Sequence, residues 1–141
     1  MITASGKIID RRYRIGIRNI TRAVVPARVV LENCEPNQVD GVHLGHALQV
    51  IGHQGTSEAS VQPGDSPSAF FDVVYDEMLE GRPYGKAFGL CYAAAVKLFA
   101  IPRGSYVLTL RVEGDGLQSR KQFGIYQDPR TQLLTMREVS Q

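Results

Sequence analysis

The three histidines of this chain are the residues whose types and spacing come nearest to a metal site. His43, His46 and His53 lie close together, and Asp40 precedes them. Zinc commonly takes imidazole and carboxylate ligands, and the first two histidines could meet one ion on a turn or helix. The residues around them show no helical pattern, which favours histidines at loop or strand ends. A metal site in the Asp40–His53 loop is therefore the alternative, and no metal or other cofactor is the main expectation.

Nucleophilic and acid–base candidates are scattered rather than grouped. Cys34 and Cys91 are far apart and form no Cys-x-x-Cys pair, so we expect buried free thiols rather than a disulfide. Neither cysteine has a histidine at a spacing that indicates a nucleophile–base pair. Asp76 and Glu77 are adjacent and point to opposite faces of a strand, so they cannot act together. No catalytic residue is predicted, and the chain is expected not to be an enzyme.

An arginine-rich face is the best candidate for a binding surface. Three basic side chains share one face of the first predicted strand, residues 8–18: Arg12, Arg14 and Arg18. The other face is apolar: Tyr13, Ile15 and Ile17. The basic face could receive an acidic protein or a phosphate backbone, or it could be a solvated face that charge protects from aggregation. A net charge of +2, from 16 basic and 14 acidic residues, argues against nucleic acid.

Length and composition suit one globular domain spanning residues 1–141. Hydrophobic residues make up 43% of the 141 residues and charged residues 21%, as in ordinary soluble proteins. No apolar run is long enough to insert in a membrane, and the first residues do not form a signal peptide. The same sequence also suits a fragment of a secreted or anchored parent, so the localisation stays open.

The stretch that organises the predicted fold is a corner followed by a strand. Pro102 presets a turn, and Gly104 can take a positive φ. Tyr106 then opens a strand in which every second residue as far as Val112 is apolar. A tyrosine at this place can bury its ring and return its hydroxyl to an upstream backbone group, which is the tyrosine corner of immunoglobulin-like sandwiches. We therefore predict a structural corner at Pro102, Gly104 and Tyr106.

The next segment predicts a hairpin whose register has two solutions. Gly114-Asp115-Gly116 is a strong turn signal, and the return strand would point Leu117, Phe123 and Ile125 inward. A loop at the first two turn residues pairs Val112 with Leu117, and a loop at the last two pairs Leu108 with Phe123. Both keep the apolar faces together, so the sequence determines the facing but not the register.

Two other segments carry less certain patterns. In the strand 68–76, alternation turns Phe71, Val73 and Tyr75 inward and turns Asp72 and Asp76 outward. Residues 88–99 have both helical and alternating spacing, so a short helix competes there with a strand from about residue 92. In residues 46–52, either Leu48 and Val50 or Gln49 and Ile51 form the buried pair.

Seven to nine short strands separated by Gly and Pro turns predict an all-β protein, an antiparallel immunoglobulin-like β-sandwich. Four segments occur in an order that resembles bacterial immunoglobulin-like modules of the adhesion-related kind: Tyr13-Arg14-Ile15-Gly16-Ile17-Arg18-Asn19, Ala27-Arg28-Val29-Val30-Leu31-Glu32, Val61-Gln62-Pro63-Gly64-Asp65-Ser66 and Pro102-Arg103-Gly104-Ser105-Tyr106-Val107-Leu108-Thr109-Leu110. The resemblance implies an adhesive, spacer or docking role and transfers no catalytic residue.

These observations lead to two expectations of function from different classes. The first is a non-catalytic module that binds a protein partner, or a second copy of itself, through strand edges and loops. The irregular segments 33–57 and 77–88 would then display the recognition groups. The second is a small metal-binding protein or enzyme that uses the Asp40–His53 loop.

Overall fold

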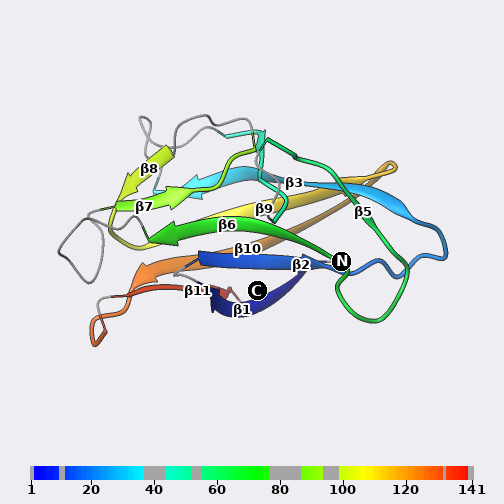
Figure 1. Ribbon diagram of the computed structural model, residues 1–141. Coiled ribbons are helices and arrows are strands. Elements are labelled where there is room, and N and C mark those ends of the chain that lie inside the picture. Colours follow the sequence, from blue (N-terminus) through cyan, green and yellow to red (C-terminus); the bar gives the residue numbers. More distant parts are fainter. Residues whose placement is uncertain are drawn as a thin grey trace.

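Two antiparallel β-sheets lie face to face in the computed structural model (Figure 1). It describes residues 2–9, 12–36, 44–51, 55–76, 87–93, 99–131 and 133–139. The strands are β1 (Ile2–Ile9), β2 (Arg12–Ile17), β3 (Val25–Glu35), β4 (His46–Ala47), β5 (Ala59–Val61), β6 (Ala69–Asp76), β7 (Ala87–Leu90), β8 (Phe99–Pro102), β9 (Tyr106–Gly114), β10 (Leu117–Gln127) and β11 (Leu134–Glu138). The predicted all-β, antiparallel sandwich is confirmed.

The strand order divides the chain into a five-stranded and a six-stranded sheet. The first has the order β1-β2-β6-β7-β8, the second has the order β11-β10-β9-β3-β4, and β5 pairs with β3. The described ranges hold eleven strands rather than seven to nine, because β1 was not predicted and the ambiguous segment 88–99 contributes to both β7 and β8. The described residues of that segment contain no helix; residues 94–98 lie outside them. No helix in the described part of the chain could span a membrane.

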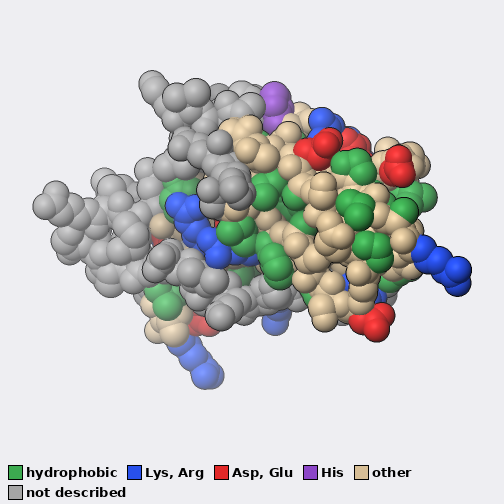
Figure 2. Space-filling model, turned by 45° about the vertical axis from the view of Figure 1, so that its right-hand side comes forward, with side chains coloured by type: hydrophobic (Ala, Val, Ile, Leu, Met, Phe, Trp, Pro, Cys, Tyr) green, Lys and Arg blue, Asp and Glu red, His purple; other side chains and the backbone are tan. Residues whose placement is uncertain are grey.

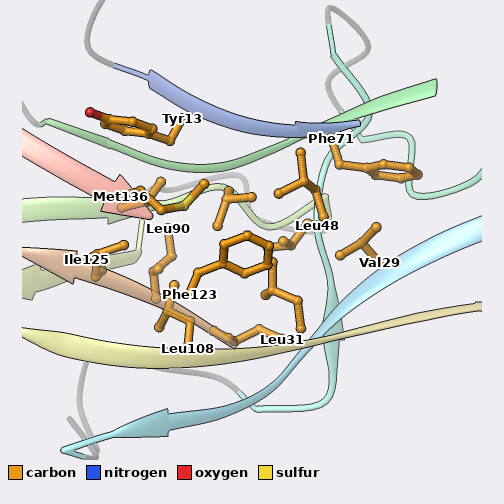
Figure 3. Close-up of a cluster of buried hydrophobic side chains, with 14 of the residues drawn as sticks. Tyr13, Val29, Leu31, Leu48, Phe71, Leu90, Leu108, Phe123, Ile125 and Met136 are labelled. Atoms are coloured by element: carbon orange, nitrogen blue, oxygen red, sulfur yellow. The ribbon is translucent and has the colours of Figure 1, made fainter. Parts of the chain in front are cut away.

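The core fills the space between the sheets with side chains from alternate strand positions. On β9 the alternation is as predicted, with Tyr106, Leu108, Leu110 and Val112 all buried. Figure 3 shows side chains of both sheets pointing toward one another, among them Tyr13 of β2 and Phe123 of β10. Burying these aliphatic and aromatic groups contributes roughly 1.5–3 kcal/mol for each large side chain.

The β9–β10 hairpin adopts the second of the two predicted registers. Asp115 and Gly116 form the two-residue turn with φ of 53° and 80°, the left-handed values that such a tight connection requires. Leu108 consequently lies opposite Phe123. Leu117 lies on the same face of β10 as Phe123, as predicted, but it is not buried: its side chain is 58% exposed because it lies at the end of the sandwich, next to the turn.

The corner before β9 connects the two sheets. The buried Tyr106 donates its hydroxyl hydrogen bond to the carbonyl of Pro102 at 2.6 Å. Between them, Arg103 extends to the five-stranded sheet, where its guanidinium contacts both carboxylate oxygens of Asp76. The same guanidinium lies over the Phe88 ring, 5.1 Å from its centroid. The corner is therefore held by a hydrogen bond within its own segment and by an ion pair to β6, which belongs to the same sheet as β8.

A change of register in β6 explains why Asp76 is buried, and two covering arginines explain why Asp72 is buried. Tyr13 lies opposite Val74, but the next residue, Arg14, lies opposite Asp72, so β6 carries one extra residue. Asp72 and Asp76 were expected to face solvent, yet they are only 1% and 2% exposed. Sequence alternation cannot reveal a bulge, and it cannot show which arginines will cover a carboxylate.

Residues 46–51 close one side of the sandwich by moving from one sheet to the other. Ala47 pairs with β3, Leu48 forms a bridge with Tyr92, and Val50 forms a bridge with Phe71 of β6. Leu48 is buried and Val50 packs against the core, which decides between the two predicted pairs. Such sheet-switching segments occur at the corners of sandwiches.

We expect Tyr106→Phe to lower the free energy of unfolding by about 1–2 kcal/mol, because it removes the hydrogen bond of a buried hydroxyl. Urea unfolding followed by circular dichroism measures this difference. Tyr126→Phe is the control, since Tyr126 is half-buried on β10, and it should change stability by only a few tenths of a kcal/mol. Equal effects of the two substitutions would contradict a role for the Tyr106 hydroxyl.

Candidate functional site

The three arginines of the predicted binding surface make different contacts in the structure. Arg14 forms an ion pair with Asp72 at 2.7 Å, and Arg12 approaches the same carboxylate at 3.6 Å. Arg18 instead donates to the backbone carbonyl of Asp65 at 3.4 Å, near the end of the sandwich. Two of the three candidate binding residues thus neutralise a buried carboxylate, and only Arg18 lies near a cleft.

Aromatic packing fixes the position of Arg12 further. Its guanidinium lies over the Tyr75 ring, 5.2 Å from the centroid. The ring in turn covers Gly89 of β7 so closely that a Cβ atom there would overlap it. This part of the five-stranded sheet is therefore a packed layer of side chains rather than an open basic surface.

The outer face of the six-stranded sheet carries a ladder of alternating charges. Glu113 binds Arg28 and Arg111, and Glu32 binds Arg111 and Arg120. The hydrogen bond from Arg120 is the main cause that lowers the pKa of Glu32, and the bond from Arg28 is the main cause that lowers the pKa of Glu113. Because these side chains satisfy one another, the ladder offers an acidic or basic partner little uncompensated charge.

A broad hollow with a volume of about 670 Å³ lies on the six-stranded sheet, at the end away from the β9–β10 turn. Gly124 lies in its lining, and Arg137 lies over the Tyr126 ring at 5.4 Å. Glu35 and Glu138 also line it. The lining mixes charged, polar and apolar groups, so it favours no single class of ligand.

The structure describes only part of the predicted metal site. His46 lies exposed on β4, with its ring edge-on to Tyr92 at a centroid distance of 6.1 Å. The other predicted residues, Asp40, His43 and His53, lie outside the described residues. Within the described ranges, no three His, Cys, Asp or Glu side chains gather as metal ligands would.

Both cysteines are buried free thiols, as expected from their spacing. Burial raises the pKa of Cys34 to about 11 and the pKa of Cys91 to about 12. Asp72 adds to the shift of the second thiol through its negative charge. A thiol with so high a pKa is protonated near neutral pH and is a poor nucleophile or metal ligand.

The most distinctive surface feature is an apolar cleft of about 440 Å³ at one end of the sandwich. It opens between the end of β2, the start of β3 and the β9–β10 hairpin; we call it the end cleft. Four buried core residues lie in its lining: Ile17, Ala27, Val61 and Val112. Ile20 and Leu117 also line it and are 69% and 58% exposed. Large apolar side chains exposed beside an apolar cleft are typical of a binding surface.

The loop that displays Ile20 is held in place by the buried side chain of Asn19. The amide nitrogen of Asn19 donates to the carbonyls of Ala23 at 2.7 Å and Val61 at 2.9 Å. Its amide oxygen accepts from the backbone N–H and the hydroxyl of Thr21. The exposure of Ile20 is therefore part of a loop conformation that the hydrogen bonds of Asn19 hold in place.

Figure 2 turns toward the viewer the end of the molecule that carries the hairpin and the start of β3. Hydrophobic side chains form separate patches there among uncharged groups, and charged side chains lie mostly toward the margin. The sequence pattern gave no sign that Ile20 is exposed, and it placed Leu117 on the inward face. Their only signal is an apolar residue directly beside a turn residue, Asn19 or Gly116, and many buried residues share it.

No family model matches this chain, and no curated protein or solved structure matches it either.

We expect Arg14→Gln to lower the free energy of unfolding by about 2–3 kcal/mol, because it leaves the buried Asp72 carboxylate with only the longer Arg12 contact. Arg28→Gln is the matched control, since Arg28 is 45% exposed in its pair with Glu113; it should cost under about 1 kcal/mol. Chemical unfolding of the two variants measures both values. Equal losses would show that the Asp72 ion pair is no stronger than the surface ladder.

We expect the two cysteines to make stability fall at alkaline pH. The pKa of each folded thiol lies above the ordinary 9.0, so folding is favoured fully below pH 9.0 and less as pH rises toward about 11 and 12. The urea midpoint should therefore fall as pH rises from about 9 toward about 12. The Cys34→Ala, Cys91→Ala double variant should show a smaller fall than the parent, and an unchanged fall would contradict the thiol contribution.

Proposed function

We propose that this chain is a non-catalytic interaction module that binds a protein partner through the end cleft and the strand edges and loops around it. The observation that carries the proposal is the exposure of Ile20 and Leu117 beside an apolar cleft. Both side chains belong to turns of defined geometry, the Asn19 loop and the Asp115-Gly116 hairpin. The structure thus holds apolar groups in water at fixed positions, as recognition surfaces do.

The energetics of this surface favour a modest, reversible interaction. Burying an aliphatic side chain completely contributes roughly 1.5–3 kcal/mol. Because the two turns are already ordered, little conformational entropy is lost when a partner binds. Two anchors and one cleft suit a transient docking contact better than an obligate interface, which buries a larger and more continuous apolar area.

Likeness to bacterial immunoglobulin-like modules of the adhesion-related kind remains part of this proposal. The two-sheet sandwich supports it, and so does the hydrogen bond from Tyr106 to Pro102 at the entry to β9. In such sandwiches the loops gather at the two ends and provide the variable binding surface. The end cleft occupies that position here.

We expect a photo-crosslinking amino acid, benzoylphenylalanine, to capture a discrete partner when it replaces Ile20 and the protein is expressed in its native host. The same replacement at Arg130, an exposed turn residue, is the control and should give no adduct of that mass. Adding Leu117→Ser should reduce the capture at position 20 severalfold, since it removes the second anchor. Equal capture at both positions, or no capture at position 20, would contradict binding of a partner at the end cleft.

A further inference from the structure

The six-stranded sheet has an open edge beside the end cleft. β11 pairs with residues 123–127 of β10, and the Val139 N–H donates to the carbonyl of Gln122 just beyond them. Within the described ranges, no strand pairs with residues 117–121 on this side; β1, the nearest strand of the facing sheet, pairs with β2. In the described part of the chain, the earlier part of β10 therefore pairs with β9 on one side and with no strand on the other, although β1 comes close to β10 without pairing with it.

Strand geometry shows which backbone groups face that edge. Because Gln122 directs its carbonyl toward the β11 side, alternate residues of β10 direct their N–H and C=O groups the same way. These alternate residues are Gln118 and Arg120. Each presents one backbone donor and one acceptor to the open side, which is the arrangement that a further strand can recognise.

The open edge and the end cleft form one continuous surface. Leu117, Gln118 and Ser119 all line the cleft. Ser119 lies opposite Val112 on β9, so its small side chain occupies the core-facing side of the sheet where larger residues stand farther along. A strand added beside β10 would direct every second side chain toward this side and into the apolar cleft.

The charges around the cleft select among possible strands. Arg18 lines the cleft and Arg22 is exposed on the loop that carries Ile20; residues 18–25 contain no acidic side chain. On the open stretch of β10, Arg120 is paired with Glu32 and Lys121 with Glu138, so their charges are largely compensated within the fold. Glu113 also lines the cleft and is paired with arginines of the outer ladder. The positive charge that favours an acidic partner therefore comes from Arg18 and Arg22.

We propose that residues 117–121 of β10 accept an extended peptide segment of a partner protein as an added strand. The segment carries branched aliphatic side chains at alternate positions, which enter the end cleft, and a carboxylate at its ends, which lies near Arg18 and Arg22. This inference rests on the proposed function and specifies its partner chemistry. The backbone of the segment bonds to Gln118 and Arg120, and its aliphatic groups cover Val112 and the rim residue Leu117.

The test uses the full chain and a synthetic probe, acetyl-Asp-Thr-Val-Thr-Ile-Asp-amide. We expect saturable shifts in the amide NMR signals of Gln118, Arg120, Ile20 and Val112, and slower hydrogen exchange at the first two. Arg22→Ser should weaken binding severalfold, since it removes one positive charge from the rim. Arg130→Ser, on the exposed turn after β10, should leave the affinity unchanged.

Two methylated probes separate strand addition from simple insertion into the cleft. One carries N-methyl groups on the valine and isoleucine amides, and the other carries them on the two threonine amides. Because the amides of a strand alternate between its edges, one methylated probe should lose at least about tenfold in affinity and the other should bind like the parent peptide. Neither probe requires a change in the protein, so misfolding cannot produce the result.

Each contrary result identifies what has failed. Equal affinities of the methylated probes, or shifts at Ile20 and Val112 without shifts at Gln118 and Arg120, would overturn strand addition. A dimer in sedimentation whose protected amides are those of Gln118 and Arg120 would assign the edge to a second copy and overturn the proposal. Absence of peptide binding, together with capture at position 20, would overturn the strand partner while leaving the proposed function intact.

Discussion

Where β2 passes β6, one step along β2 corresponds to two residues of β6, between the pairs Tyr13–Val74 and Arg14–Asp72. This extra residue places Asp72 opposite Arg14, on the side of the strand away from the core residue Tyr13, and it places Asp76 opposite the buried Phe88. Asp76 can then pair with Arg103, which lies in the corner between β8 and β9. The ion pair that attaches this corner to β6 of the five-stranded sheet therefore depends on a local change of register in a single strand.

Most of the arginines near these sheets act within the fold. Arg14 and Arg103 neutralise buried aspartates, and Arg111 shares the two glutamates of the outer ladder with its neighbours. A buried carboxylate without its partner would be strongly unfavourable, whereas an exposed pair contributes little to stability. These arginines therefore have a structural role in ion pairs within the fold. In the described part of the chain, exposed apolar side chains and an unpaired stretch of β10 lie together at the end of the sandwich that carries the end cleft.

The sequence predicted features that depend on local chemistry. Alternation along β9 identified its buried face, and the turn residues identified the hairpin, because side-chain period and backbone φ are properties of neighbouring residues. It failed for Asp72 and Asp76, whose burial depends on a bulge and on arginines distant in the chain. It also failed for Leu117, because the point at which a strand leaves the core depends on the length of its neighbours and cannot be read from alternation.

Strand lengths explain why the proposed edge lies at this end of the sandwich. β10 spans Leu117–Gln127, whereas β11 spans only Leu134–Glu138, so in the described part of the chain the shorter strand leaves part of the longer one unpaired. The hairpin turn keeps that part fixed against β9, and the hydrogen bonds of Asn19 keep the facing loop fixed at the other side of the cleft. A strand edge that lies between an ordered hairpin and an ordered loop can bind an extended chain with little rearrangement. The preorganised loops and the unequal strand lengths therefore both favour the proposed binding of a peptide strand.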